Sequence, residues 1–293
     1  MKELSLRYEH RMQNEPCLLT FEVFADLHVL LPKRNRKLEN ALDDIWERKV
    51  KDVIILGDLS AQGFMFQLEQ CLKQCKEYPI RYMIALGNHD IYSMKEKAQV
   101  HIHPLYKELV LLHHSTLYYE EQREGFSFYV LNSEKPDKNH AYYSPQQLLW
   151  LKEHLEKADP HKPVFICCHH PLMHTHRNMN TPENTMGFQS HELTRIVNIH
   201  PLVIFLSAHI HNSYEICTIY CDHKLFEINV PSFTNTQYGE KKEEVGYQLQ
   251  LFHDFLYIRT RDYHTHEWIL SHEYILDFKS HQCIPYTQEA HNA

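Results

Sequence analysis

Short polar motifs follow apolar, strand-like runs along the first two thirds of this chain. In chain order the motifs are Asp26-Leu27-His28, Gly57-Asp58, Gly87-Asn88-His89-Asp90, His169-His170-Pro171 and His209-Ile210-His211. In open α/β sheets the carboxyl ends of parallel strands meet at one edge, where ligands bind. The pattern therefore predicts a sheet whose strand ends bring aspartate, asparagine and histidine side chains to a common site.

The same region alternates strand-like runs with helical patterns, which is typical of βα units in a layered α/β fold. We expect strands over Leu18–Ala25, Val53–Leu56, Arg81–Leu86, Phe126–Leu131, Val164–Cys168 and Leu202–Ser207. One helix carries an apolar stripe formed by Leu38, Ala41, Leu42, Ile45 and Trp46. A second starts at the N-cap Ser144, with Pro145 next and Gln147 placed to close a capping box. A third starts near Ser190 and ends before Pro201.

After His211 strands follow one another without intervening helices. We expect them over Tyr214–Tyr220, Lys224–Val230, Gly246–Leu251, Phe255–Thr260 and Glu267–Ser271, with Phe252-His253-Asp254 as a hairpin connection. We expect this tail to complete a second sheet. Because no repeat or proline-rich linker marks a boundary, the sequence predicts one domain over residues 1–293, with a core over about 18–262.

The composition is that of a folded soluble protein. Of the 293 residues, 43% are hydrophobic and 23% are charged. No segment approaches the roughly 18 uninterrupted apolar residues that a membrane span requires, so we expect no membrane partner. The segment Met1–Pro16 is rich in charge and lacks the apolar stretch of a secretory signal, which predicts a cytoplasmic location.

Net charge and cysteine spacing argue against two further classes of protein. The formal net charge of -8 disfavours extended nucleic-acid binding, because that affinity comes from basic side chains that displace counterions. The eight cysteines show no paired C-x-x-C spacing, so we expect no structural zinc or disulfide framework. Cys167 and Cys168 precede His169 in a strand, where we expect them to pack.

The motif residues together fit a site for two metal ions. Two divalent cations about 3.5–4 Å apart need oxygen and imidazole ligands on both sides and one carboxylate between them. Alternation along an extended segment puts His209 and His211 on the same side. Each motif alone could simply cap a helix or form a turn, so the argument depends on their order at successive strand ends. Of the 25 histidines the motifs contain six, and pairs such as His101/His103, His113/His114 and His264/His266 lack comparable neighbours.

All five motifs, in this order, resemble those of the calcineurin-like metallophosphoesterase superfamily. The resemblance runs from about Phe21 to Arg261, and Ala208 stands where the family usually has a glycine. It implies a four-layer αββα sandwich with two mixed β-sheets flanked by helices. It also implies a binuclear-metal-dependent phosphoric ester hydrolase that acts through a metal-activated hydroxide.

The resemblance also implies individual roles at the site. The metal ligands would be Asp26, His28 and His211 for one ion, Asn88, His169 and His209 for the other, and Asp58 bridging both. His89 would act at the substrate phosphate as transition-state stabiliser or proton donor, with Asp90 either orienting it or serving a turn. His170 receives no metal bond. Because the ligand set contains no thiolate, we expect manganese or iron, with zinc as an alternative.

Two features give information on the substrate: the motif spacing and the loop Met173–Gln189, in which Arg177 is the only arginine or lysine. His28, Asp58 and Asn88 are separated by 30 residues each, a compact layout that resembles class III cyclic-nucleotide phosphodiesterases. We expect Tyr92–Tyr119 and the loop Met173–Gln189 to line the mouth, and Asn88, His89 and Arg177 to bind substrate.

This layout predicts hydrolysis of small phosphodiesters, such as a cyclic nucleotide. A phosphomonoesterase acting on a small molecule or protein is the main alternative. A nuclease and a non-enzymatic scaffold are further alternatives, and the sequence leaves the physiological substrate and oligomeric state open.

Overall fold

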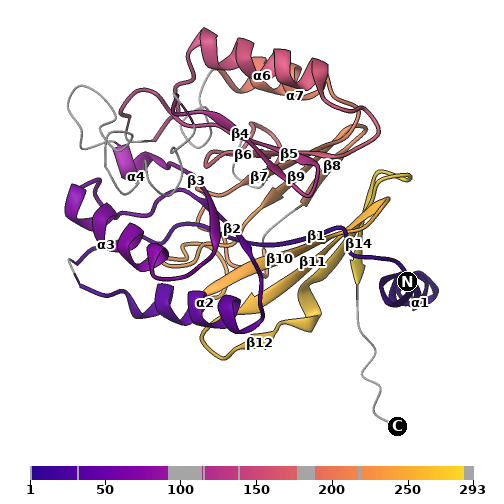
Figure 1. Ribbon diagram of the computed structural model, residues 1–293, viewed down its shortest axis with the longest axis horizontal. Coiled ribbons are helices and arrows are strands. Elements are labelled where there is room, and N and C mark those ends of the chain that lie inside the picture. Colours follow the sequence, from indigo (N-terminus) through magenta and orange to yellow (C-terminus); the bar gives the residue numbers. More distant parts are fainter. Residues whose placement is uncertain are drawn as a thin grey trace.

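The computed structural model describes residues 2–31, 33–91, 114, 116–137, 139–176, 189–216 and 219–286. Two β-sheets pack face to face, and helices cover the outer face of each (Figure 1). Helices α2 (Arg36–Glu47) and α3 (Met65–Lys76) cover one sheet, and α6 (Pro145–Lys157) and α7 (Ser190–Val197) cover the other. The expected four-layer αββα sandwich is confirmed.

The first sheet combines strands from both ends of the chain. Its order is β14-β13-β11-β10-β1-β2-β3, with β12 paired to β11. The bounds are β1 Leu19–Phe24, β2 Asp52–Leu56, β3 Arg81–Ala85, β10 Val245–Leu251, β11 Phe255–Asp262, β12 Glu267–Trp268, β13 Glu273–Asp277 and β14 Gln282–Tyr286. Strands β1, β2 and β3 run parallel, whereas β10 joins β1 antiparallel.

The second sheet is formed from the middle of the chain, in the order β4-β5-β6-β7-β9-β8. The bounds are β4 Tyr119–Arg123, β5 Phe126–Val130, β6 Val164–Cys167, β7 Val203–Ser207, β8 Ile219–Asp222 and β9 Leu225–Asn229. Its four central strands are parallel, and its two edge strands are antiparallel to their neighbours. The site-bearing ends of β6 and β7 therefore point the same way.

The expectation that the C-terminal tail completes the second sheet is wrong for most of the tail. Only β8 and β9 join that sheet, whereas the strands from β10 onward extend the first sheet. The expected strand over Tyr214–Tyr220 begins only at Ile219, and the one over Glu267–Ser271 gives way to a 3-10 turn at Leu270. The hairpin at Phe252-His253-Asp254 is confirmed, since β10 and β11 pair antiparallel around it.

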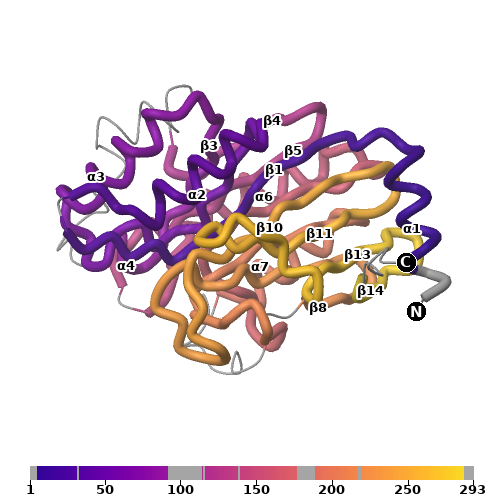
Figure 2. The backbone as a smooth tube through the Cα atoms, turned by 90° about the horizontal axis from the view of Figure 1, so that it is seen from below, coloured from indigo at the N-terminus to yellow at the C-terminus, as the bar shows by residue number. Residues whose placement is uncertain are grey.

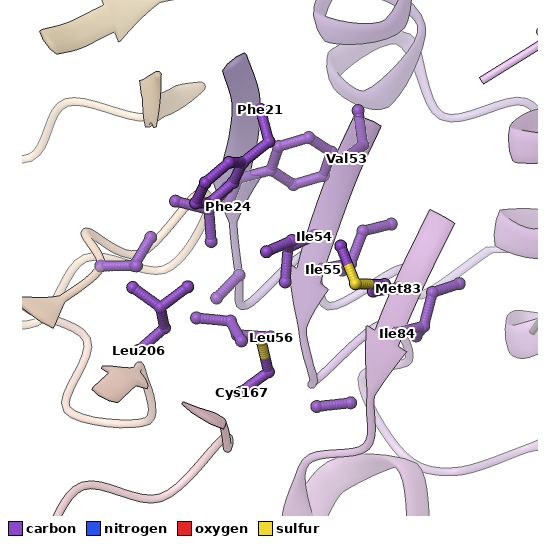
Figure 3. Packing of buried hydrophobic residues seen from close by; sticks show 14 of the residues in the cluster. Phe21, Phe24, Val53, Ile54, Ile55, Leu56, Met83, Ile84, Cys167 and Leu206 are labelled. Carbon is purple, nitrogen blue, oxygen red and sulfur yellow. The ribbon is translucent and has the colours of Figure 1, made fainter. Parts of the chain in front are cut away.

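Aliphatic and aromatic side chains form one buried core between the two sheets, and Figure 3 shows part of it. Phe128 and Phe165, from the second sheet, stack with ring centroids 4.5 Å apart. Phe21, from β1, meets both rings edge-on at 5.4 Å. Each buried ring of this kind contributes roughly 1.5–3 kcal/mol through burial alone. This contact holds β1 against the second sheet, and so brings the two sets of strand ends together.

Helix boundaries agree with the sequence in part. The Ser144 side chain accepts the Gln147 N–H, as expected for an N-cap, but the Gln147 side chain bonds the backbone of Asn132 instead of closing a capping box. The Glu134 side chain, and not that of Gln147, accepts the hydrogen bond from the backbone N–H of Ser144. Ser190 is the first residue of α7 and accepts the Met173 N–H, so it is not the N-cap.

The stripe on α2 packs as predicted except at Trp46. This side chain remains 49% exposed, because it lies at the edge of the buried face of the helix.

Elements continue beyond both ends of the expected core. Helix α1 (Lys2–Asn14) docks on the late strands (Figure 2). There Tyr8 packs edge-on against Phe255 and donates a hydrogen bond to Asp277. Strands β13 and β14 carry the sheet to Tyr286. The single-domain assignment itself stays a prediction.

Candidate metal centre

Strand ends from both sheets bring the motif residues together. Asp26 and His28 follow β1, Asp58 follows β2, and Asn88 opens the short helix α4 (Asn88–Ile91) after β3. From the other sheet, His169 follows β6, and His209 and His211 follow β7. The motif residues that the sequence placed on separate strands thus meet at one edge of the sandwich.

Four of these residues form a compact cluster. Ligand atoms of Asp26, His28, Asp58 and His211 all lie within 4.8 Å of one another. The Nε2 atoms of His28 and His211 are 3.1 Å apart, and His211 Nε2 lies 3.7 Å from Asp26 Oδ1. Ring nitrogens and carboxylate oxygens that converge in this way form a donor set suited to a divalent cation.

A second group shares one carboxylate with this cluster. Asp58 Oδ2 lies 3.6 Å from His28 Nε2 and 3.4 Å from His169 Nε2. The His169 ring centroid is 5.2 Å from that of His209, whose Nδ1 lies 3.0 Å from Asn88 Oδ1. One oxygen of Asp58 therefore lies between the two groups that the sequence assigned to two metals.

Buried atoms without partners test whether these residues fit a metal. Both carboxylate oxygens of Asp26, Asp58 Oδ2 and His169 Nε2 are buried and make no hydrogen bond among the residues that the structure describes. An uncompensated buried charge is costly, and buried charges in proteins are paired or coordinate metals. The residues present therefore fit divalent cations, which would compensate these atoms.

Backbone carbonyls hold the histidine rings from behind. His169 Nδ1 donates to Leu56 O at 2.6 Å, and His211 Nδ1 donates to Asn235 O at 2.8 Å. Such bonds place the proton on Nδ1 and leave Nε2 as the ligand atom. Sequence reasoning did not identify Leu56 or Asn235, because any residue type can supply a carbonyl.

Five candidate ligands adopt backbone conformations that residues with a side chain rarely take. Their φ angles are 60° for Asp26, 45° for His28, 52° for Asp58, 71° for His209 and 57° for His211. Positive φ is uncommon for residues other than glycine, although Asp, Asn and His are enriched there, and such strain gathers at functional sites. The tight turns at the strand ends thus aim these side chains at one point.

The two motif glycines are required by close packing. A Cβ atom on Gly57, whose φ is +82°, would lie 2.5 Å from Gly87 N and 2.8 Å from His169 Nδ1. A Cβ atom on Gly87 would lie 2.0 Å from Asp58 Oδ1. Any larger residue at either position would displace a candidate ligand.

Burial and mutual contacts shift the pKa values in the site. Burial raises the pKa of Asp26, and it lowers the pKa values of His28 and His209 to about 3. Burial also opposes charge on Asp58 and His169, but their mutual attraction outweighs it. The pKa of Asp58 is well below its usual value, and that of His169 is raised to about 9. His28 and His209 are thus neutral beside an ionised Asp58, and these are the forms that bind a cation, whereas His169 must give up a proton when a cation binds in its place beside Asp58.

His89 and Asp90 have different surroundings. His89 Nδ1 lies 2.7 Å from Ala61 O, its backbone N–H donates to Asp58 Oδ1, and its ring meets that of His28 edge-on at 4.7 Å. The Asp90 carboxylate accepts hydrogen bonds from the backbone of Ser60 and Gly87. These contacts place the Asp90 carboxylate in the turn after β3, and Ala61 holds the His89 ring. The roles of His89 and Asp90 in the reaction stay predictions.

Three further residues of the motif region are buried around the ligands. The His170 ring packs 4.4 Å from that of His209. Cys167 and Cys168 are fully buried, as expected. These residues form the packed wall behind the candidate ligands.

A pocket of about 890 Å³ opens beside His28, His89 and His211. Its remaining described lining comes from Ala61, residues 235–237, 241–244, 262 and 264–265. The expected mouth segments lie largely outside the described residues, as does Arg177. The charged run Lys241-Lys242-Glu243-Glu244 was the sequence signal for this wall of the pocket. Its charge pattern is also typical of an ordinary surface turn, so it did not identify the pocket.

A model of the calcineurin-like phosphoesterase family matches residues 19–213, which is more than half of the chain. The chain therefore belongs to this family, and its class is that of metal-dependent phosphoric ester hydrolases. The family and the Asp/His cluster together indicate a divalent metal site. The resemblance inferred from the motifs is thereby confirmed.

Solved structures show the same fold at low sequence identity. A purple acid phosphatase from yellow lupin seeds has a TM-score of 0.67 and 14% identity over 94% of this chain. This chain spans 57% of the lupin chain. GAP50, described as the anchor in the inner membrane complex of Plasmodium, has a TM-score of 0.58 and 10% identity over 94% of this chain and 91% of that one. A search of curated proteins finds no match.

Among the described residues, no helix is long and apolar enough to cross a membrane.

Proposed function

We propose that this chain is a two-metal phosphodiesterase that hydrolyses small phosphodiesters, such as a cyclic nucleotide. The observation that carries the two-metal assignment is the position of Asp58 Oδ2, which lies 3.6 Å from His28 Nε2 and 3.4 Å from His169 Nε2. Asp26 and His211 complete one group, and Asn88 and His209 complete the other. A carboxylate in this position would hold two divalent cations together with these histidines.

The protein's own groups provide position and proton transfer. Bound metals would supply an activated water and would offset negative charge on the phosphoryl oxygens. His89 Nδ1 donates to Ala61 O, so His89 presents Nε2 at the pocket. In its doubly protonated form the ring donates the Nε2 proton to the leaving oxygen and returns to the neutral form that keeps its proton on Nδ1. We expect Asn88 and His89 to contact the substrate phosphate. Such proton donation contributes roughly 10²–10⁴-fold to a rate.

The charge of the pocket favours diesters. Its described lining contains Lys241 and Lys242 but also Glu243, Glu244 and Asp262, and Lys242 pairs with Asp262 at 2.7 Å. A monoester dianion needs several cationic donors, whereas a diester carries one negative charge and needs room for a second alcohol. A wide pocket with little excess positive charge suits the diester.

The donor set supports manganese or iron as the bound metals, with zinc as the alternative. Carboxylate, amide oxygen and imidazole suit all three ions, and affinity order alone does not choose among them. The eight cysteines show no paired spacing in the sequence, which supports a cytoplasmic location.

Comparison of two nitrophenyl esters tests the diester preference. The manganese-loaded protein is expected to cleave bis(nitrophenyl) phosphate with a higher kcat/KM than nitrophenyl phosphate. Asp58→Ala, assayed in parallel, controls for contaminating activity. A tenfold preference for the monoester would replace this proposal with a phosphomonoesterase.

Lys241 supports that second candidate function. It lines the pocket, is exposed and has no ion-pair partner among the described residues, so it is available to a second phosphate charge. If monoesters are preferred, Lys241→Ala should raise KM for them, because it removes ground-state binding. The expected role of Arg177 in binding substrate stays a prediction, tested by the same measurement on Arg177→Ala.

A further inference from the structure

Exposed apolar side chains gather on two loops next to the metal centre. We call this set the apolar rim, and its members are Leu30, Leu31, Phe64, Met65 and Phe66. They are between 37% and 55% exposed. Three of them are consecutive at the start of α3, where a soluble protein ordinarily places polar residues. Exposed apolar clusters of this kind mark interaction sites.

Contacts between the loops make the apolar rim one surface. The Gln67 side chain of α3 donates to Leu30 O at 3.0 Å, which ties the two loops together. The rings of Phe64 and Phe66 stack on each other at 5.7 Å, with their outer faces exposed. In Figure 1 the loop into α2 and the start of α3 lie on the left, on the same side as α4. The rim therefore borders the edge that carries the candidate ligands.

Basic side chains flank the apolar rim. Lys33 and Arg36 are exposed and have no ion-pair partner among the described residues, whereas Arg34 pairs with Glu39 and Glu77. A pocket of about 550 Å³ is lined by Leu30, Leu31, Lys33 and Arg36, and it reaches His28. The surface thus combines exposed apolar groups, two unpaired cations and a path to the metal centre.

We propose that the apolar rim and its two cations dock this protein on the surface of an anionic phospholipid bilayer. Apolar side chains insert at the headgroup level, and nearby lysines and arginines are attracted to anionic lipids. The formal net charge of the chain is -8, so the attraction must come from a local cationic face such as this one. Docking in this way turns the pocket that reaches His28 toward the bilayer.

A second copy of the chain fits this surface less well. In a two-fold dimer the same patch meets itself, so the shared surface would contain two copies each of the cations Lys33 and Arg36. An anionic lipid surface instead complements both the charge and the apolar groups. The sequence led us to expect no membrane partner because it contains no membrane-spanning run. Peripheral docking needs no such run, so the proposal replaces that expectation.

Vesicle sedimentation with the purified full chain tests the proposal without depending on any activity. The protein should sediment with vesicles of phosphatidylcholine containing 30% phosphatidylserine at least tenfold more strongly than with phosphatidylcholine alone. The double variant Phe64→Ser/Phe66→Ser and the double variant Lys33→Ala/Arg36→Ala should each lose roughly tenfold or more in binding to anionic vesicles.

Leu149→Ser/Lys157→Ala is the matched control, because both side chains are exposed on α6 over the other sheet. It should bind like the unchanged protein. Thermal unfolding of every variant verifies that these exposed substitutions leave the fold intact.

Three results would overturn the proposal. They are equal binding to both vesicle types, loss of binding in the α6 control, and a dimer in solution that Phe64→Ser/Phe66→Ser converts to a monomer. The last result would make the rim a contact between copies. Because none of these measurements uses hydrolysis, failure of the phosphodiesterase proposal leaves this test unaffected.

Discussion

Glu22 and Asp26 are buried carboxylates four residues apart on one strand and its extension, yet their surroundings are opposite. Glu22 Oε1 accepts hydrogen bonds from Arg48 at 2.6 Å and Gln248 at 2.8 Å, and Oε2 accepts one from Tyr263 at 2.8 Å. Neither oxygen of Asp26 has a hydrogen-bond partner among the described residues. Protein donors thus satisfy both oxygens of Glu22, whereas the oxygens of Asp26 remain available to a bound cation.

Asp44 belongs to the same hydrogen-bonded network as Glu22, because Arg48 donates to both carboxylates. Its carboxylate accepts hydrogen bonds from Arg48 and Arg261, and Trp268 lies over both guanidinium groups. The comparison teaches that burial alone does not distinguish a structural carboxylate from a metal ligand. What separates Glu22 from Asp26 is hydrogen bonding to both carboxylate oxygens, because an unpaired buried charge destabilises the fold until something binds it.

The largest expected effect is at the bridging position. Asp58→Ala should remove most bound metal and abolish activity, because both ligand groups lose the carboxylate that they share. Metal analysis of the purified variant measures the loss. Full two-metal occupancy in that variant would refute the bridging assignment.

His89→Ala tests whether the histidine next to the candidate metal ligands takes part in the hydrolysis reaction without binding metal. The variant should keep its metal but lose roughly 10²–10⁴-fold in kcat. The loss should shrink for esters with a good leaving group, since a weakly basic alcohol needs little protonation. Equal losses for good and poor leaving groups would exclude a proton-donor role.

The same chemical change at the two carboxylates sharpens the comparison directly. In the metal-free protein, Glu22→Gln should lower the free energy of unfolding by about 3–5 kcal/mol, because it breaks a buried charge network. Asp26→Asn should leave that free energy unchanged or higher, because it removes an uncompensated charge. Urea unfolding with a chelator measures both. Similar destabilisation by both substitutions would show that other groups of the protein already compensate the charge of Asp26.

The smallest expected effect is on pH dependence. Burial, followed by the nearby charge of Asp58, raises the pKa of Asp90 to about 6. Its contribution to stability is therefore complete below the unfolded pKa of about 3.9 and is lost as pH rises through about 6, by up to about 3 kcal/mol. Asp90→Asn should lack this loss in the metal-free protein. Urea unfolding of both proteins between pH 4 and pH 7 measures the difference.

Asp44 supplies the opposite sign for comparison. Burial opposes its charge, but Arg261 and Arg48 outweigh burial and lower its pKa. Its contribution is therefore present above the unfolded pKa and is lost as pH falls through the folded value. Parallel curves for wild type and Asp90→Asn across the whole range would contradict the assignment to Asp90.

Sequence reasoning worked best where local pattern determines structure. The strands before each motif, the N-cap Ser144 and the hairpin at Phe252-His253-Asp254 follow from periodicity and short-range chemistry, and all are present. It failed for the C-terminal strands. Their alternation indicates a strand but not which sheet the strand joins, and the pairing of β10 with β1 joins residues more than 200 positions apart.

By itself the sequence determined which residue types stand at the strand ends, and so the chemistry that this edge can perform. Only the tertiary structure decided that one oxygen of Asp58 lies between two histidines, and that residues 235–237 and 241–244 line the pocket. Only the tertiary structure separated Glu22 from Asp26. The physical reason is that the partners of a buried group come from distant segments, as Tyr263 does for Glu22, and no local pattern encodes that meeting.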